Sequence, residues 1–280
     1  MTPLELTLVS FCISVVAGGL GSLLGLGGGI IVVPALTLWL GIDIRYAIGA
    51  SIVSVIATSS GAAAAYVRER MTNLRVAMLL EMATTAGALS GAYLAGVIGG
   101  RWLYVIFGAI LAASAIQMLR NGRQRAAGAV PDDRLADLLR LHETYYDAAR
   151  GQEIAYRVTH TRLGLFLMYV AGVVSGLLGI GSGVLKVPAM DLAMRLPIKV
   201  STATSNFMIG VTAAGSAGVY FARGDIDPFV AAPVAAGVLL GATAGAWLLG
   251  KLRGRVIRVV FVLVLLGVSL EMLWKGVRLA

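Results

Sequence analysis

The chain has 280 residues, of which 58% are hydrophobic and only 13% are charged, and its mean hydropathy is +0.87. Soluble domains carry about 25% charged residues, so this composition excludes an ordinary soluble protein. The formal net charge of +9 does not indicate nucleic-acid binding, because Lys and Arg cluster between the apolar runs, as in the loops of membrane proteins. The single cysteine, Cys12, excludes an intrachain disulfide.

Apolar runs follow one another in two sets of five, and most reach the roughly 20 residues that a membrane-spanning helix needs. A transmembrane barrel would need alternating segments of about ten residues, which the sequence lacks. We therefore expect an all-α, polytopic membrane protein. The first set covers residues 5–25, 28–41, 46–66, 74–98 and 102–119, and the second covers 163–180, 183–194, 199–221, 229–250 and 256–275.

The two sets are copies of one another. Shifting the chain by 154 residues aligns residues 17–35 with residues 171–189, and ten of these nineteen positions are identical. The same offset continues without a gap into the later segments, where Ser51 meets Ser205 and Tyr66 meets Tyr220. Such a repeat predicts two membrane units, residues 1–120 and 162–280, joined by a linker at 121–161.

The second copy is expected to enter the membrane from the opposite side, because each copy has an odd number of segments. Loop charges support this inverted topology. Loop 68–75 has three Arg, whereas its counterpart 222–228 has one Arg and two Asp; one loop later, 99–101 is poor in basic residues and 251–258 has four. Equivalent loops that exchange their positive charge should lie on opposite faces of the membrane.

This charge pattern also predicts the orientation of the chain. With the N-terminus outside, every strongly basic loop falls in the cytoplasm, namely 68–75, 120–125, 195–199 and 251–258. The linker 121–161 is then cytoplasmic as well. The C-terminal sequence "KGVRLA" violates the rule mildly, since it lies outside and carries Lys275 and Arg278.

Within the linker, residues 131–150 are expected to form an amphipathic helix that rests on the membrane or on the protein, with a regulatory role as the alternative. Asp132 or Asp133 would cap this helix. Leu135, Leu138, Leu139 and His142 would share one of its faces. The two histidines, His142 and His160, lie too far apart on a polar loop for a metal site, and no metal is expected.

A glycine cluster interrupts each copy at the same place and precedes a short apolar segment. The clusters are Gly25, Gly27, Gly28 and Gly29 in one copy and Gly179, Gly181 and Gly183 in the other, and Pro34 and Pro188 follow them. Broken helices survive in a membrane only inside protein or along a watery cavity, and they point free N–H groups into it. Two breaks related by inverted symmetry should meet near the bilayer midplane, where secondary transporters bind substrate.

Close helix packing and a phosphate-binding loop are the other interpretations of these glycines. Close helix packing is preferred for the G-x-x-x-G pairs Gly87/Gly91 and Gly241/Gly245, and it remains the alternative for the two clusters. Neither cluster fits the phosphate-loop pattern or stands between a strand and a helix.

Polar residues near the breaks are the candidates for binding. Lys186 has Val32 as its counterpart and is either functional or a lysine that snorkels to the interface. Glu81 would carry a proton or make a structural hydrogen bond, and Asp191 would pair with Lys186 or Lys199. The candidate substrate-binding residues are Gly27, Gly28, Gly29, Ser51, Gly181, Ser182, Gly183, Lys186, Thr204, Ser205 and Asn206, and the candidates for proton coupling are Glu81 and Asp191.

The doubled glycine-rich motif, at residues 21–36 and 175–190, resembles that of the sulfite exporter TauE/SafE family, also called toluene sulfonate uptake permeases. The similarity covers nearly the whole chain outside 121–161 and includes the hydroxyl-rich stretches 49–51 and 202–206. The resemblance implies a multi-pass transporter of small anions in the prokaryotic plasma (inner) membrane, coupled to protons or to the membrane potential. Ser182 and Lys186 depart from the pattern, so the identity of the anion does not carry over.

We therefore expect a secondary transporter that moves a small anion, such as sulfite, a sulfonate or an organic acid, by alternating access. A passive anion channel and a non-transporting membrane assembly protein are the alternatives. An enzyme is not expected, because the sequence has no intramembrane histidine, no H-E-x-x-H motif and no close carboxylate pair. The expected partners are the anion and the lipid bilayer, without nucleic acid or cofactor, and a homo-oligomer is left open.

Overall fold

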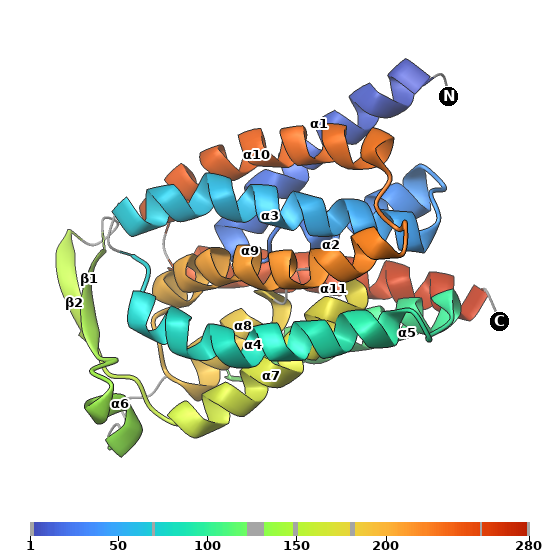
Figure 1. Ribbon diagram of the computed structural model, residues 1–280. Coiled ribbons are helices and arrows are strands. Elements are labelled where there is room, and N and C mark those ends of the chain that lie inside the picture. The colour runs from blue at the N-terminus through green and yellow to red at the C-terminus, as the bar shows by residue number, and fades with distance from the viewer. Residues whose placement is uncertain are drawn as a thin grey trace.

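Two series of helices, alike in order and length, follow one another along the chain (Figure 1). The computed structural model describes residues 3–68, 71–121, 132–147, 151–179, 183–252 and 254–278. The first series is α1 (Pro3–Leu24), α2 (Gly29–Pro34), the π-helical turn η1 (Ala35–Trp39), α3 (Ile44–Arg68), α4 (Leu74–Ala95) and α5 (Gly100–Asn121). The second is α7 (Thr161–Leu178), α8 (Gly183–Pro188), the π-helical turn η2 (Ala189–Ala193), α9 (Ile198–Ala222), α10 (Pro228–Lys251) and α11 (Gly254–Arg278).

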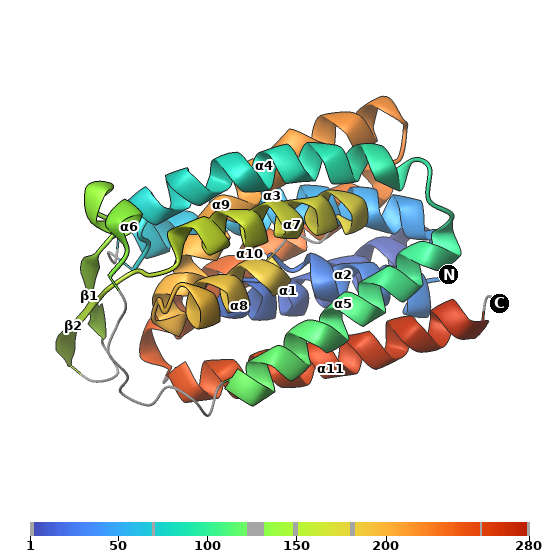
Figure 2. The same cartoon turned by 90° about the horizontal axis from the view of Figure 1, so that it is seen from below.

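The long helices run side by side in Figures 1 and 2, and both chain ends lie at the end of the bundle opposite the linker. Among the residues described, three helices are long and apolar enough to cross a membrane by length and composition: Leu4–Leu24, Thr161–Leu178 and Pro228–Leu249. The predicted all-α membrane protein is confirmed, with one small hairpin in the linker as its only addition in the described part of the chain.

The 154-residue offset reappears in the structure. Helices α2, η1 and α3 end and begin at positions that match those of α8, η2 and α9 after the shift. Contacts between elements are exchanged in the same way, because α1 packs along α10 while α7 packs along α4, and α3 packs against α9. The two repeats are therefore interleaved rather than set apart as separate bodies.

Glycines make the close helix contacts possible. A Cβ atom on Gly91 would overlap the carbonyl oxygen of Val173 on α7, and one on Gly245 would overlap that of Gly19 on α1. These two contacts are counterparts in the repeat. The packing interpretation of the G-x-x-x-G pairs is confirmed, since small residues here let two backbones approach closely.

Gly91→Ala is expected to destabilise the protein by about 3 kcal/mol, because only backbone atoms of α7 surround the added methyl group and they cannot turn aside. Thermal unfolding in detergent measures this effect. Gly267→Ala in α11 is the control, since nothing lies within 4 Å of its Cβ position. That control should stabilise the helix by roughly 0.5–1 kcal/mol, and equal effects of the two variants would contradict the packing argument.

The linker prediction is wrong in its main feature. Instead of one helix over 131–150, the structure has a short α6 (Arg134–Leu138), followed by the antiparallel strands β1 (Glu143–Asp147) and β2 (Gln152–Tyr156). Arg140 adopts a left-handed backbone with φ 50°, which ends the helical course. Asp133 caps α6, as one of the two proposed caps.

After α6, buried and exposed side chains alternate as in a strand and do not follow the period of a helix. Tyr145 and Asp147 are buried on one face of β1, whereas Tyr146 between them is exposed. Leu138 and Leu139, expected to share one helical face with Leu135 and His142, are exposed. Tyr145 meets Tyr156 edge-to-face across the hairpin with 6.3 Å between ring centroids. The hairpin thus packs its own aromatic face onto a core shared with α4, α7, η2 and α9.

Candidate functional site

Both predicted helix breaks are present. Helix α1 ends at Leu24 and α2 begins at Gly29, while α7 ends at Leu178 and α8 begins at Gly183. Gly25 and Gly27 have φ values of 73° and 79°, and Gly28 has 70°, which only glycine adopts without strain. Gly181 and Ser182 lie outside the described residues, so their predicted roles stay predictions.

The two breaks lie against each other. The Ser51 hydroxyl on α3 donates to the Gly179 carbonyl at 2.7 Å, and the Ser205 hydroxyl on α9 donates to the Gly25 carbonyl at 2.8 Å. A Cβ on Gly183 would overlap the Gly25 carbonyl oxygen, so the start of α8 touches the first break. Figure 2 shows the short helices α2 and α8 along the middle of the bundle, away from its two ends.

These contacts assign a bracing role to several predicted donors in this conformation. Ser51 and Ser205 each tie the other repeat's break to a long helix, which is a pair of counterparts at the 154-residue offset. The Gly29 N–H donates to the Gly27 carbonyl at 2.7 Å, and the Gly27 N–H reaches the Gly21 carbonyl at 3.4 Å. In this conformation, these hydroxyl and N–H groups therefore make hydrogen bonds within the protein.

The first turns of α9 carry a fully buried polar cluster. Thr204 accepts a hydrogen bond from the Asn73 N–H at 3.1 Å, and the Asn206 amide donates to the Ser22 carbonyl at 2.6 Å. Within the described part of the chain, three buried atoms of this cluster have no hydrogen-bond partner: Ser201 Oγ, Thr202 Oγ1 and Asn206 Oδ1.

The first repeat does not share this polar cluster. The counterparts of Ser201, Thr202 and Asn206 on α3 are the apolar residues Ala47, Ile48 and Ile52. The fold of the repeat therefore does not require these polar groups. Their burial without partners costs about 1–3 kcal/mol each, which distinguishes them from ordinary packing residues.

Lys186 lies wholly inside the protein, with its side chain 0% exposed, so the snorkelling alternative is wrong. Its ammonium donates to Thr212 Oγ1 at 2.7 Å and to Glu81 Oε2 at 3.4 Å. The Thr212 and Thr85 hydroxyls donate to Glu81 Oε1 at 2.6 and 2.9 Å. A buried cation thus faces a carboxylate across a threonine hydroxyl.

Thr212 and Asn73 are the contributors that sequence reasoning missed. A signal for Thr212 was available, because its counterpart Thr58 also bonds at a break, donating to the Gly27 carbonyl at 3.3 Å. The 154-residue offset aligns these two threonines, which was a sequence signal that both have a role near the breaks. The signal for Asn73 was only that of a helix cap, since its counterpart Asp227 caps α10 as Asn73 caps α4.

Asp191, the other candidate for proton coupling, and Lys199, one of its two predicted partners, lie on η2 and α9. Asp191 is buried on η2, one residue after Met190. Lys199, at the start of α9, donates to Asp147 Oδ1 on β1 at 2.8 Å, and both side chains are buried. The linker hairpin is thereby joined to the helix that carries the polar cluster.

The family model for the sulfite exporter TauE/SafE proteins matches residues 10–272. The chain belongs to this family. Similar proteins include the "Probable membrane transporter protein YunE" of Bacillus subtilis, 26% identical over 95% of this chain and 96% of its own length. Another, a "Probable membrane transporter protein" of Xylella fastidiosa strain 9a5c, is 27% identical over 97% of this chain and 98% of its own length. No solved structure matches.

The match confirms the recognition made from the doubled glycine motif. It reaches across both repeats and the linker, whereas the motif itself occupies two short stretches. Together with the helical fold, it identifies this TauE/SafE protein as a membrane transporter.

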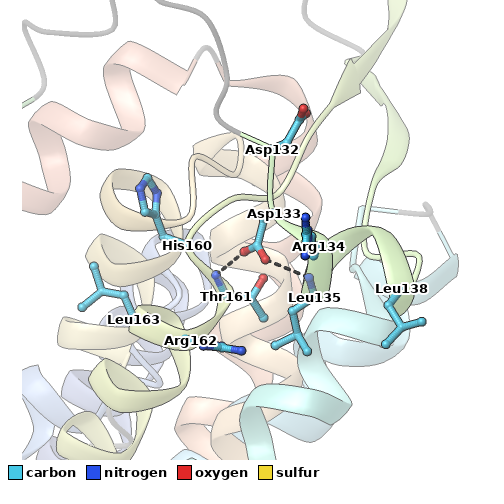
Figure 3. A pocket seen from close by; sticks show the side chains of 9 residues that line it. All are labelled: Asp132, Asp133, Arg134, Leu135, Leu138, His160, Thr161, Arg162 and Leu163. Carbon is cyan, nitrogen blue, oxygen red and sulfur yellow. Dashed lines mark hydrogen bonds between the residues drawn. The ribbon is translucent and has the colours of Figure 1, made fainter.

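A surface pocket of about 600 Å³ lies where the linker of this TauE/SafE protein meets α7 (Figure 3). Asp133 stands at its centre and accepts hydrogen bonds from the Thr161 N–H at 2.6 Å and the Leu135 N–H at 3.0 Å. Burial alone raises the pKa of Asp133, but these hydrogen bonds outweigh it and lower that pKa below its ordinary value. One carboxylate thus caps α6 and holds the start of α7.

Asp133→Ala is expected to lower stability by roughly 1–2 kcal/mol, since the cap and the bond to α7 are lost together. Because the folded-state pKa is depressed, this stabilisation is present above the ordinary aspartate value of about 4 and fades as the pH falls through the folded value. Hydrogen exchange of the Leu135 and Thr161 amides measures it. Asp132→Ala is the control: its side chain is 80% exposed, and it should change stability by less than about 1 kcal/mol.

Proposed function

We propose that this protein is a secondary transporter that carries a small anion, such as sulfite or a sulfonate, across the prokaryotic plasma membrane by alternating access. The observation that carries the proposal is the three partnerless atoms in the polar cluster of α9, beside two apposed helix breaks. Buried polar groups are nearly always paired in native structures, so a cluster of three calls for a ligand in another state of the protein.

The chemistry of the cluster suits an oxyanion. The Ser201 and Thr202 hydroxyls can each donate to an anionic oxygen, and the Lys186 ammonium supplies positive charge. Asn206 Oδ1 is an acceptor, which suits a ligand that also carries an O–H or N–H group. The break at Gly27–Gly29 would add backbone N–H groups once its internal bonds open, and residues 181–183 are the counterparts that we propose for the second repeat.

Alternating access would arise from tilting of one repeat against the other. The exchanged element contacts and the crossed braces Ser51–Gly179 and Ser205–Gly25 support two equivalent arrangements of the same bonds. We place the two repeats with opposite orientation in the membrane, the N-terminus outside and the linker 121–161 in the cytoplasm. Glu81 and Asp191 are the proposed proton carriers.

Uptake by purified protein in liposomes tests the proposal, with radiolabelled sulfite and methanesulfonate as substrates. Thr202→Val removes the partnerless hydroxyl and keeps the side-chain shape. If the hydroxyl serves transport, uptake should fall at least about tenfold while thermal stability stays equal or rises, because an unpaired polar atom has been removed. A hydroxyl with a purely structural role would give the opposite pair of results.

Ser90→Ala is the matched control, because that hydroxyl bonds within α4 and is solvent- or lipid-accessible. It should leave uptake unchanged. Saturation with substrate separates a transporter from a channel, whose flux would rise in proportion to concentration. Wild-type liposomes that take up none of these anions, under an inward or an outward gradient, would overturn the proposal.

A further inference from the structure

The ion pair of Lys186 and Glu81 breaks the symmetry of the repeat. At the 154-residue offset, the counterparts of these two residues are Val32 and Ala235, both apolar. The bridging residue Thr212, by contrast, has Thr58 as its counterpart. One copy of the same fold therefore forms without any charge here. Because apolar replacements of a buried ion pair are often as stable as the pair itself, stability alone does not account for its presence.

The contact between the two charges is loose. The Nζ–Oε2 distance is 3.4 Å, whereas charge-assisted hydrogen bonds usually measure about 2.7–2.9 Å. The ammonium makes its closer bond, at 2.7 Å, to the neutral Thr212 hydroxyl. The Glu81 side chain retains 13% exposure, while Lys186 has none. The cation is thus fixed, and its carboxylate partner is the more easily displaced of the two.

We propose that Glu81 is a built-in anion that occupies Lys186 until a monoanionic substrate replaces it, and that Glu81 binds one proton for each anion bound. This inference rests on the proposed function, because it describes how the anion enters. The substrate class is narrowed to anions of single charge, such as a sulfonate or hydrogensulfite, and fully ionised dianions such as sulfate are excluded.

The balance of charge is the reason for this restriction. Before exchange, the site holds one ammonium and one carboxylate. After exchange, it holds the ammonium, the bound monoanion and a neutral carboxylic acid, whose new O–H bond takes its proton from solvent. The net charge stays zero in both states. Binding a monoanion without the proton, or a dianion with one proton, would leave a negative charge uncompensated in a buried site.

Hydroxyl groups are placed to accommodate both forms of Glu81. Thr212 and Thr85 donate to Oε1, and Thr84 lies 3.4 Å from Oε2. A hydroxyl donates to a carboxylate and accepts from a carboxylic acid after rotation about its C–O bond. Glu81 can therefore gain a proton without leaving a polar atom unpaired.

Several other titratable groups stand on the elements packed around the pair. Among the described residues, Asp191 on η2 is the other buried carboxyl near Lys186, and Lys199 is bonded to Asp147. The Tyr220 hydroxyl on α9 donates to the Gly176 carbonyl. The rest are Arg75 and Tyr93 on α4, Arg162 and Tyr169 on α7, and Arg101 and Tyr104 on α5. Asp191 is thus the competing proton acceptor that an experiment must separate.

Calorimetry of methanesulfonate binding to the wild-type protein in detergent measures how many protons are taken up per anion bound. Methanesulfonate keeps a single charge at all working pH values, so any proton uptake belongs to the protein. Binding heats in two buffers of different ionisation enthalpy should report about one proton taken up per anion. Affinity should then rise about tenfold for each unit of pH decrease, over the pH range in which one proton is taken up per anion. Sulfate should bind at least about tenfold more weakly.

Two variants assign the proton to its residue. Glu81→Gln keeps the hydrogen-bonding shape without the charge, so it should bind methanesulfonate with no proton uptake and no pH dependence. Asp191→Asn should keep both the proton uptake and the pH dependence. Proton uptake on methanesulfonate binding that survives Glu81→Gln, or that disappears in Asp191→Asn, would overturn the inference.

The wild-type measurement alone decides the matter if a variant does not fold. Methanesulfonate binding without proton uptake, or sulfate binding as tight as methanesulfonate, would overturn this inference and leave the proposed function standing. Absence of binding by any tested anion would overturn both.

Discussion

Lys186→Met is expected to reduce anion uptake by more than about 100-fold and to destabilise the protein by about 3 kcal/mol. Removing one partner of a buried charge pair costs about 3–5 kcal/mol, since the other charge stays buried without compensation. We take the lower end because Glu81 keeps 13% of its side chain exposed. The loss of uptake follows from the loss of the only cation bonded to the Glu81–Thr212 group within the described residues.

A second substitution separates the two effects. Lys186→Met combined with Glu81→Gln removes both charges, so thermal stability should return to within about 1 kcal/mol of the wild type, as neutral replacements of buried pairs usually allow. Uptake should stay abolished. Lys251→Met is the control, because this lysine is exposed at the end of α10, where it stacks on Trp247. If the double variant recovered uptake together with stability, Lys186 would be a structural residue.

The sequence predicts best those features that depend on one residue type at one place. Left-handed backbone at Gly25, Gly27 and Gly28 requires glycine, so the first break could be located to within a residue. The repeat offset then located the second break, which ends α7 at Leu178. Local chemistry and internal duplication were sufficient for this part of the fold.

The sequence alone could not predict which distant residues form pairs. Glu81 lies 105 positions from Lys186, and nothing in the local pattern of either residue indicates the other. Asp191, five residues from Lys186, was the nearer acid and the natural sequence-based partner. The actual pairing depends on α4 and α8 both packing against α9, which is a property of the whole bundle.

The serines illustrate an intermediate case. Ser51 and Ser205 were identified as candidates because hydroxyls near a break can serve an anion, yet they donate to the break carbonyls in this conformation. Their equivalence at the offset was a signal of symmetric structural bonds. Ser201 and Thr202 have no polar counterpart in the first repeat, and that asymmetry is the better guide to a binding role.

The linker was mispredicted because apolar spacing alone does not distinguish a short helix from an alternating strand. Leu135, Leu138 and Leu139 fit a helical face, and the aromatic residues after position 142 fit a strand equally well. Tertiary contacts decided between them, since Tyr145 and Tyr156 are buried against the membrane helices. The Asn73 amide donates to the Leu141 carbonyl and to the Tyr156 hydroxyl, both at 2.9 Å, which joins the linker to the base of α4.

Lys199→Met is expected to loosen this hairpin and to cost about 3 kcal/mol, because it removes one partner of a buried ion pair. The two side chains are only 3% and 7% exposed, so water cannot easily replace the lost partner. Hydrogen exchange across β1 and β2 should accelerate with the loss of thermal stability. Adding Asp147→Asn should recover part of the stability, since both charges of the buried pair are then removed.

The matched control is Arg157→Met, which breaks an ion pair of similar length on the same hairpin. Arg157 lies 3.1 Å from Asp132, but the two side chains are 49% and 80% exposed. Such a surface pair contributes about 0–1 kcal/mol, so this variant should change stability little. Equal effects of Lys199→Met and Arg157→Met would mean that burial does not strengthen the contact. A large difference would instead show that the buried Lys199–Asp147 pair contributes to holding the linker on α9, the helix of the polar cluster.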